Sequence, residues 1–188
     1  LTFQFDENFS SLKLQINPTA KIVSGQELHT SSVVYSWVNQ LIEGKESFVR
    51  SKTIGKTKLK RPFRVLDIYK GSPKNKPVLV LITRQHPPEV TGYFAFQAFL
   101  STILEENKLT SSFLDHYRIL AFPLMNPDGV DLGHWRHNAG GVDTNRDWSF
   151  YHQPEIKTTV DYITQVLKKN NSKLILGLDF HSTWYDVF

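Results

Sequence analysis

A continuous apolar run at residues 78–82, Val-Leu-Val-Leu-Ile, constrains the fold of this 188-residue chain more than any other segment. Strands that are buried on both faces have such runs, whereas strands with one wet face alternate. Apolar stretches at 117–124 and 173–181 predict two further strands. Helical patterns at 89–107 and 154–170, with apolar side chains three or four residues apart, separate the three strands. This alternation predicts an α/β fold with a central mixed, largely parallel sheet flanked by helices.

The segment before this alternation has a different pattern. Residues 1–16 alternate apolar and polar side chains at period two, which predicts two strands. We therefore divide the chain into residues 1–28 and residues 29–188. The first part is a β segment, either an edge hairpin or the tail of another domain, and the second is an α/β unit. Because the only methionine is Met125, we expect the natural N-terminus to lie outside this sequence.

A helix and a basic hairpin are expected between these regions. Thr30 precedes a helical pattern that ends at Gly44. The apolar face of this helix is expected to carry Val33, Val34, Trp37 and Leu41. Residues 47–70 are interpreted as two extended segments around a lysine-rich turn. Much of the net charge of +4 lies at 56–64, and we interpret this basic run as a solvated strand edge.

Composition narrows the classes of protein. The chain has no cysteine, which excludes disulfides, thiolate metal sites and a cysteine nucleophile. No apolar run approaches the roughly 20 residues that span a bilayer, so we expect no membrane span. No base-stacking motif accompanies the basic run, and we expect no nucleic-acid partner. A chain without cysteine suits the cytoplasm as well as the periplasm or the extracellular space.

Two histidines and a glutamate stand at strand ends. His86-Pro-Pro-Glu89 follows the strand at 78–82, and His181 closes the strand at 173–181. In open α/β sheets, ligands bind beyond the carboxyl ends of the strands, so both segments are expected at one edge. Two imidazoles and one carboxylate are the ligands of a catalytic zinc that keeps a fourth position for water. These three residues are therefore the predicted ligands of one zinc ion, and a hydrolase is the first hypothesis.

A polar, glycine-rich loop is expected at the same edge. It starts at Asn126-Pro-Asp-Gly129, which is a turn sequence. Arg136, Asn145 and Arg146 in this loop indicate anion recognition, because arginine clamps a carboxylate through two parallel hydrogen bonds. Asp143 is a candidate to orient the ring nitrogen of a zinc-bound histidine that faces away from the metal. Taken alone, the segment is equally consistent with a surface loop whose charges have no role.

Other polar residues near these motifs have simpler explanations. His134 and His137 lie in the loop without a helix to set their geometry, and a fourth protein ligand would overfill a catalytic zinc. We interpret them as loop histidines. Asp179 shares a strand face with His181 and is either a strand-end cap or a partner of that histidine. Glu155 begins a helix, where a negative charge is favourable.

Six segments, taken together and in order, resemble the zinc carboxypeptidase family, in particular its bacterial and cytosolic-carboxypeptidase-like branch. They are Arg84-Gln-His-Pro-Pro-Glu-Val-Thr-Gly92, Asn126-Pro-Asp-Gly129, Gly133-His-Trp-Arg136, Gly141-Val-Asp-Thr-Asn-Arg-Asp-Trp148, Gln153-Pro-Glu155 and Asp179-Phe-His-Ser-Thr183. An ordered set of this kind is far more specific than any one segment. The resemblance implies a zinc carboxypeptidase-like sandwich, with residues 29–188 as the N-terminal portion of its catalytic domain.

The resemblance also implies roles for single residues. The zinc ligands would be the two histidines and the glutamate named above. Arg136 would polarise the scissile carbonyl and stabilise the oxyanion, and Asp143 would support His86. Asn145 and Arg146 would hold the free C-terminal carboxylate of a peptide substrate. The implied activity is hydrolysis of the C-terminal peptide bond through a metal-activated water.

One role stays unassigned. In this family the general base is a glutamate well beyond the second zinc histidine, and no residue of this chain can be given that role. We therefore expect the domain to be truncated at its C-terminal end, and this species to hydrolyse peptides poorly. Two alternatives stay open. One is an aspartoacylase-type zinc amidohydrolase acting on N-acyl amino acids, and the other is a zinc- or peptide-binding protein without activity.

Overall fold

The computed structural model describes residues 2–8, 11–15, 17–19 and 24–182. Leu1, Ile16 and Thr183, which belong to predicted segments, lie outside the described residues. The helices and strands follow in the order β1 (Thr2–Phe5), β2 (Leu12–Gln15), α1 (Ser31–Ile42), β3 (Val49–Lys56), β4 (Pro62–Ile68), β5 (Val78–Thr83), α2 (Val90–Ile103), α3 (Lys108–His116), β6 (Arg118–Phe122), α4 (Pro127–Leu132), a 3-10 turn at Thr144–Arg146, α5 (Pro154–Asn170) and β7 (Leu174–Phe180).

Five strands form the central sheet, in the order β3-β4-β6-β5-β7. β4 is antiparallel to both its neighbours, whereas β5 is parallel to β6 and to β7. Four of the five strands therefore point the same way, and the predicted mixed, largely parallel sheet is confirmed. Parallel neighbours need a crossover, and the helices between β5, β6 and β7 supply it.

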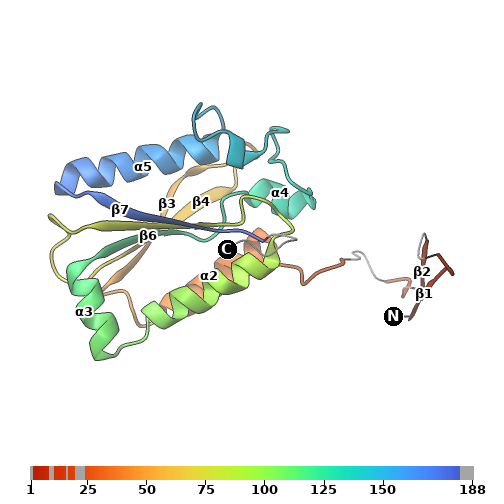
Figure 1. Cartoon of the computed structure of the whole chain (residues 1–188), viewed down its shortest axis with the longest axis horizontal. Helices are drawn as coiled ribbons and strands as arrows, with labels where there is room; N and C mark the ends of the chain where they lie inside the picture. Colours follow the sequence, from red (N-terminus) through yellow and green to blue (C-terminus); the bar gives the residue numbers. More distant parts are fainter. Residues whose placement is uncertain (1, 9–10, 16, 20–23, 183–188) are drawn as a thin grey trace.

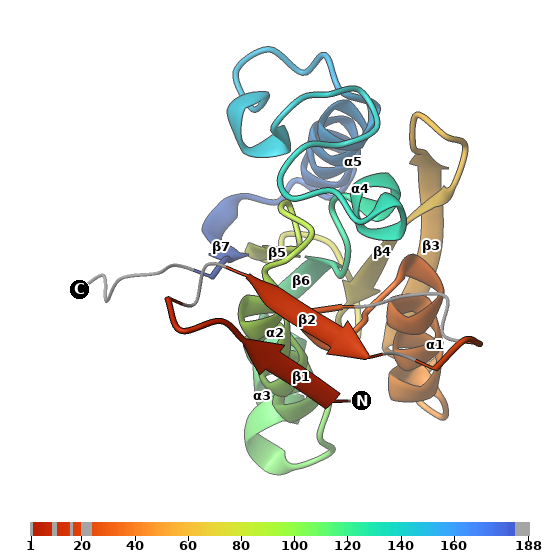
Figure 2. The same cartoon turned by 90° about the vertical axis from the view of Figure 1, so that its right-hand side faces the viewer.

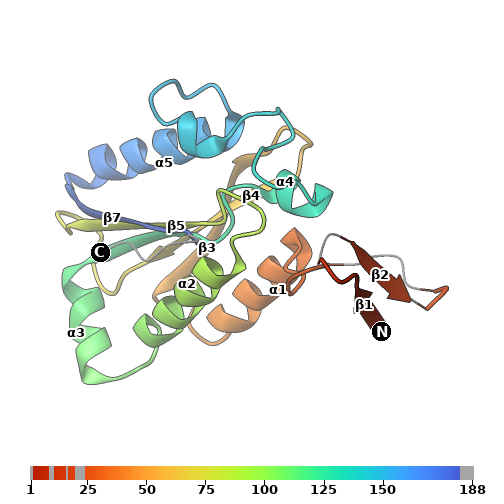
Figure 3. The same ribbon diagram turned by 45° about the vertical axis from the view of Figure 1, so that its right-hand side comes forward.

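Helices cover both faces of the sheet. α5 lies on one face, and α1, α2 and α3 lie on the other (Figures 1 and 3). β5 shows why both layers are present. Leu79 and Leu81 pack in the core with α1, α2 and α3, while Val78, Val80 and Ile82 pack in the core with α5. The continuous apolar run of this strand therefore reflects burial on both faces.

The first helix forms where the sequence predicts it, with a shifted buried face. The Thr30 side chain accepts a hydrogen bond from the backbone N–H of Val33, which confirms Thr30 as the N-cap. Val34 and Val38, four residues apart, are fully buried. Val33, which the sequence placed on the apolar face, is 43% exposed because it points to one side of that stripe. Trp37 packs partly buried against the same core.

A second helix was missed after α2. The pattern at 89–107 predicted one helix, but α2 ends at Ile103 and α3 starts at Lys108. Asn107 accepts from the backbone N–H of Thr110, and the Thr110 hydroxyl completes a capping box with the backbone of Asn107. The Asn-Lys-Leu-Thr sequence was the signal, and a new cap of this kind starts a new helix.

The Asn126-Pro-Asp-Gly129 segment forms a short helix, α4, in place of the predicted turn. The Asn126 side chain caps it by accepting from the backbone N–H of Gly129. Gly133 ends the helix in the left-handed region, at a φ of 67° that favours glycine. The chain enters the loop beyond this point in a defined direction.

The basic run at 56–64 is only partly a solvated edge. Its lysines are exposed, but Arg61 donates to Asp128 Oδ1 at 2.9 Å and to Asp131 Oδ2 at 2.7 Å. Asp131 also accepts from the backbone N–H and the hydroxyl of Ser31 at the start of α1. Two carboxylates of α4 therefore join this helix to the β3–β4 turn and to α1. The sequence pattern did not predict these contacts.

The N-terminal strands form a sheet of their own. β1 and β2 pair antiparallel, with Thr2 opposite Gln15 (Figure 2). The predicted pair of strands is thus present, while the domain boundary near residue 28 stays a prediction. In the described part of the chain, no helix has the length and apolar character needed to cross a membrane.

An ion pair inside the sheet links β4 to β6. Asp67 is fully buried and accepts from Arg118 Nε at 2.7 Å and from Arg118 Nη2 at 2.8 Å. Lys52 Nζ on β3 lies 2.7 Å from Asp67 Oδ2. Burial alone would raise the pKa of Asp67, but hydrogen bonds from Arg118 and Lys52 lower it below its ordinary value.

We predict that Asp67→Asn lowers the free energy of unfolding by about 3–5 kcal/mol, because it leaves the buried Arg118 charge without a carboxylate. Urea unfolding measures the loss. The control is Asp161→Asn, which removes an exposed carboxylate paired with Lys157 on α5 and is expected to cost less than about 0.5 kcal/mol.

The difference in stability between the wild type and Asp67→Asn is expected to depend on pH. Because the folded-state pKa of Asp67 is lowered, its contribution is complete above the unfolded-state pKa of about 3.9 and is lost as the pH falls through the folded-state value. The stability advantage of the wild type over Asp67→Asn is thus full at neutral pH and shrinks below about pH 4. An advantage that does not change with pH contradicts this assignment.

Candidate metal centre

Three segments meet beyond the carboxyl ends of β5 and β7. His86 and Glu89 lie between β5 and α2, and His181 follows β7 directly. Asp143 and Asn145 come from the loop between α4 and α5. His86 Nε2 lies 3.0 Å from Asp143 Oδ1, and Asn145 Nδ2 lies 3.3 Å from His181 Nε2. The predicted convergence on one edge of the sheet is therefore present.

The two imidazole rings face the Glu89 carboxylate from either side. His86 Nδ1 lies 2.7 Å from Glu89 Oε1, and His181 Nδ1 lies 2.5 Å from Glu89 Oε2. The ring centroids are 5.0 Å apart. Candidate ligand atoms of the three residues all lie within 4.8 Å of one another, and among the described residues this is the group with the arrangement of a metal site.

Each ring is held from behind by a second carboxylate. His86 Nε2 contacts Asp143 Oδ1 at 3.0 Å, and His181 Nε2 contacts Asp179 Oδ2 at 2.6 Å. Metal-bound histidines usually have their second ring nitrogen held in this way, which sets the orientation of the ring. Of the two interpretations of Asp179, the geometry favours the partner of His181.

The proximity of these groups shifts their proton affinities. Burial alone would raise the pKa of Glu89, but hydrogen bonds from His181 and His86 lower it to about 2. Hydrogen bonds to Asp179 and to Glu89 raise the pKa of His181 to about 10. Three carboxylates around two rings thus make this edge strongly attractive to positive charge.

The donor set fits a zinc ion with an open coordination position. Two imidazole nitrogens and one carboxylate are one of the ligand sets that catalytic zinc uses. The His86 side chain is 5% exposed, whereas that of His181 is 26% exposed. The centre is therefore buried on the β5 side and open on the β7 side, where another ligand has access.

The backbone around the site is restricted at two positions, Arg84 and Gly92. Arg84, the residue after β5, has a φ of 58°, which is uncommon for a residue other than glycine. Gly92, in the first turn of α2, lies against the end of β7, and a Cβ there would meet the carbonyl oxygen of His181 at 2.5 Å. The backbone N–H of Gly92 donates to Ser182 Oγ at 3.0 Å. Only glycine permits this approach, which brings His181 to the start of α2.

Gln85 connects the segments of the site and was missed by sequence reasoning. It is fully buried in the turn that follows β5. Its Nε2 donates to Asp179 Oδ2 at 2.6 Å, and its Oε1 accepts from Trp148 Nε1 at 2.9 Å. Its only sequence signal was its place next to His86 in the family-like segment.

Arg84 is the other residue that sequence reasoning left without a role. Its side chain is buried under the 84–87 turn, and its Nη2 donates to the Pro87 carbonyl at 2.7 Å. The guanidinium carbon lies 5.4 Å from the centre of the Tyr93 ring. Burial lowers the pKa of Arg84 to about 10. Arg84 thus stabilises the turn that carries His86.

Arg136 reaches the centre through Asp143. Its Nε donates to Asp143 Oδ2 at 2.7 Å, and the other oxygen of that carboxylate faces His86. Its side chain is 40% exposed. Within the described residues, Nη1 and Nη2 of Arg136 have no hydrogen-bond partner, so they are free to donate to a ligand.

Asn145 and Arg146 lie on the rim of the site. The Asn145 side chain contacts His181, as described above. Arg146 is exposed, and the one hydrogen bond of its side chain within the described residues joins Nη1 to the carbonyl oxygen of Asn145 at 3.3 Å. With no carboxylate of the described chain within ion-pair distance, its guanidinium is available to an anion.

The remaining polar candidates lie outside the centre. The His134 ring contacts the carbonyl of His137, and neither joins the group of candidate ligands. Glu155 stands in the first turn of α5, as predicted, but it is fully buried and not solvated. Burial raises the pKa of Glu155, and Asn138 donates to its Oε2 at 3.2 Å.

The family profile and the similar proteins all point to one family. The sequence profile of the family described as zinc carboxypeptidase matches residues 34–183. Cytosolic carboxypeptidase 6 of Caenorhabditis elegans is 24% identical over 163 residues, which cover 82% of this chain and 35% of that protein. Cytosolic carboxypeptidase 3 of Mus musculus is 24% identical over 172 residues, which cover 85% of this chain and 17% of that protein.

Solved structures support the same fold. The metallo-carboxypeptidase from Burkholderia cenocepacia aligns with a TM-score of 0.72 at 20% identity, over 82% of this chain and 41% of that one. The chain therefore spans less than half the length of each of these three proteins. Because the family profile covers most of the sequence, and the fold and the ordered motifs agree with it, the chain belongs to the zinc carboxypeptidase family.

Proposed function

We propose that residues 29–188 are the N-terminal portion of the catalytic domain of a zinc-dependent carboxypeptidase, which hydrolyses the C-terminal peptide bond of peptides. The observation that carries the proposal is the meeting of His86 Nδ1, His181 Nδ1 and the Glu89 carboxylate, with each ring held from behind by a carboxylate. Family membership supports it.

His86, Glu89 and His181 would hold one zinc ion. When bound there, zinc would lower the pKa of a water molecule and polarise a carbonyl group. Asp143 would keep the Nδ1 of His86 directed at the ion by holding Nε2, and Asp179 would do the same for His181.

Arg136 would meet the negative charge that develops on the carbonyl oxygen of the scissile bond. Its Nε is occupied by Asp143, which fixes the guanidinium beside the centre and leaves Nη1 and Nη2 to donate. Donors that are fixed before the reaction stabilise such a charge without reorganisation.

Arg146 and Asn145 would select substrates with a free C-terminus. Arg146 supplies an exposed guanidinium on the rim, and Asn145 lies between it and His181. A carboxylate held by Arg146 would place the last peptide bond near the centre, and cleavage would then be terminal.

The two alternatives differ in what they predict. The aspartoacylase-type amidohydrolase shares the HxxE…His ligand set, and the match of the family profile to residues 34–183 favours the peptidase. A comparison of hydrolysis of a short peptide with that of an N-acyl amino acid separates these enzymes. The binding protein without activity agrees with the unassigned general base, and it predicts zinc and peptide affinity without turnover in the longest natural form.

We expect one zinc ion per chain in the wild-type protein and none in His86→Ala, because two remaining ligands hold zinc too weakly. Elemental analysis after dialysis measures the metal content. His137→Ala is the control, since this exposed loop histidine lies outside the candidate ligand group. Equal zinc content in all three proteins would place the metal elsewhere.

We expect Asp143→Asn to weaken zinc affinity by about 10- to 100-fold, because an amide orients the His86 ring less strongly than a carboxylate does. Competition with a chromogenic chelator measures the affinity, and circular dichroism checks that the variant is folded. An unchanged affinity would mean that the contact between Asp143 and His86 does not support the metal.

We expect Arg146→Ala to weaken binding of a short peptide with a free C-terminus by about 10- to 100-fold, since hydrogen bonds to charged groups contribute about 1.5–3 kcal/mol. Titration calorimetry with the zinc-loaded protein measures it. Binding of the C-terminally amidated peptide is expected not to change. Lys74→Ala, which removes an exposed positive charge elsewhere, is the control. A similar loss for both peptides contradicts the assigned role.

A further inference from the structure

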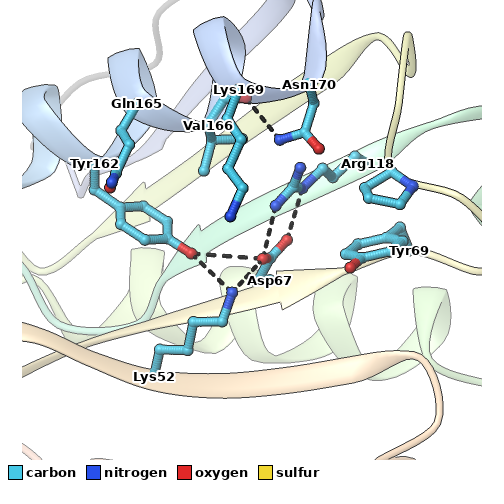
Figure 4. A pocket seen from close by; sticks show the side chains of 10 residues that line it. Lys52, Asp67, Tyr69, Arg118, Tyr162, Gln165, Val166, Lys169 and Asn170 are labelled. Atoms are coloured by element: carbon cyan, nitrogen blue, oxygen red, sulfur yellow. Dashed lines mark hydrogen bonds and ion pairs between the residues drawn. The ribbon is translucent and has the colours of Figure 1, made fainter.

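A polar cavity lies at the opposite end of the sheet from His86. Arg118 is the first residue of β6 and Asn170 the last of α5, so the cavity is far from the carboxyl ends of β5 and β7. Its volume is about 240 Å³. The side chains that line it include Lys52, Asp67, Arg118, Tyr162, Lys169 and Asn170 (Figure 4).

The floor of the cavity is a preorganised polar network. Asp67 is held by both Nε and Nη2 of Arg118 and by Lys52 Nζ. The Tyr162 hydroxyl adds contacts with Lys52 Nζ at 3.2 Å and with Asp67 Oδ2 at 3.5 Å. Both oxygens of the single carboxylate are therefore engaged, and the positions of Lys52 and Arg118 are set by it.

Positive charge exceeds negative charge in this cavity. Lys52, Arg118 and Lys169 stand against the one carboxylate of Asp67, which leaves an excess of two positive charges. Figure 4 shows Lys52 and Lys169 reaching towards Asp67 from opposite sides, one from β3 and the other from α5. Within the described residues, the side chain of Lys169 makes no hydrogen bond or ion pair.

Arg118 has a donor that the network leaves unused. Its side chain is 5% exposed, and its Nη1 has no hydrogen-bond partner among the described residues. A buried donor without a partner costs about 1–3 kcal/mol, and more when the group is charged. A positive excess next to such a donor indicates that an anion completes the site.

We propose that this cavity binds a phosphate group. A phosphate dianion matches the excess of two positive charges. The fork of Arg118 is occupied by Asp67, so lysines remain as the main charged donors, and lysine binds phosphate as a point charge. The Gln165 amide can donate to the anion, and so can the Asn170 amide N–H that does not donate to the Val166 carbonyl oxygen. A volume below the roughly 300–1,000 Å³ of drug-sized sites points to inorganic phosphate or a small phosphate monoester.

The test is a titration of the full chain with inorganic phosphate, followed by two side-chain amide NMR signals. Gln165 lines this cavity and also the neighbouring hollow that contains Lys168, whereas Asn170 lines this cavity and not that hollow. Binding is expected to shift both signals in a saturable manner. Lys169→Gln is expected to weaken the affinity at least about tenfold, because it removes one of the two lysines that converge on the site. Since Lys169 has no partner in the network, the variant is expected to remain folded.

Lys168→Gln is the matched control, because it removes the same charge one residue earlier on α5, where the side chain lies outside the cavity lining. It is expected to change the affinity by less than about twofold, by charge screening. A titration with a small phosphate monoester identifies the source of the group. Tighter binding of the ester assigns the site to a small phosphorylated molecule, and tighter binding of inorganic phosphate assigns it to the free ion.

Two results overturn the proposal. One is the absence of any shift of the Gln165 and Asn170 signals at millimolar phosphate. The other is equal weakening by Lys168→Gln and Lys169→Gln, which would mean that phosphate responds to the general positive charge of α5 and not to the cavity. Phosphate held by Arg146 at the metal centre is recognised separately, because Arg146→Ala would then abolish binding without involving the two amide signals.

Discussion

The position of the candidate metal centre depends on β5, which is held on both edges and on both faces. The strand is hydrogen-bonded to β6 on one side and to β7 on the other, and its side chains enter both cores. The chain that leaves it at Arg84 therefore starts from a rigid point. His86 and Glu89 lie on the turn that follows, and His181 lies at the matching end of β7. A parallel neighbour is required, because an antiparallel one would bring its beginning to this edge.

Carboxylates fix the parts of the molecule that surround this strand. Asp128 joins the β3–β4 turn to α4 through Arg61, and Asp67 joins β4 to β6 through Arg118. Asp143 contacts the metal centre on one side and Arg136 on the other. Each of these carboxylates has at least one cationic or imidazole partner, since a buried charge without one is costly. Paired carboxylates therefore stabilise both the fold and the candidate metal centre.

Periodicity predicted the elements that pack on a core and missed those that begin with a local hydrogen bond. β5 and α5 have long apolar patterns, and both lie where these patterns placed them. α3 and α4 are short and depend on the caps at Asn107 and Asn126, which a search for apolar spacing does not detect. Arg61 was interpreted as solvated because its partners lie near residue 130, about seventy residues along the chain. A contact of this separation leaves no local pattern.

By itself, the sequence determined the fold class, the family and the small set of residues that can carry zinc chemistry. These depend on residue type, spacing and order, which are properties of the chain alone. The family resemblance already implied that Asp143 supports His86, whereas only the tertiary structure decided between the two interpretations of Asp179 and placed it behind His181. The tertiary structure also revealed the bridging position of Gln85 and the cavity around Asp67. The physical reason is that a hydrogen bond requires about 3 Å between two atoms, and segments up to a hundred residues apart reach that distance only after the sheet has formed.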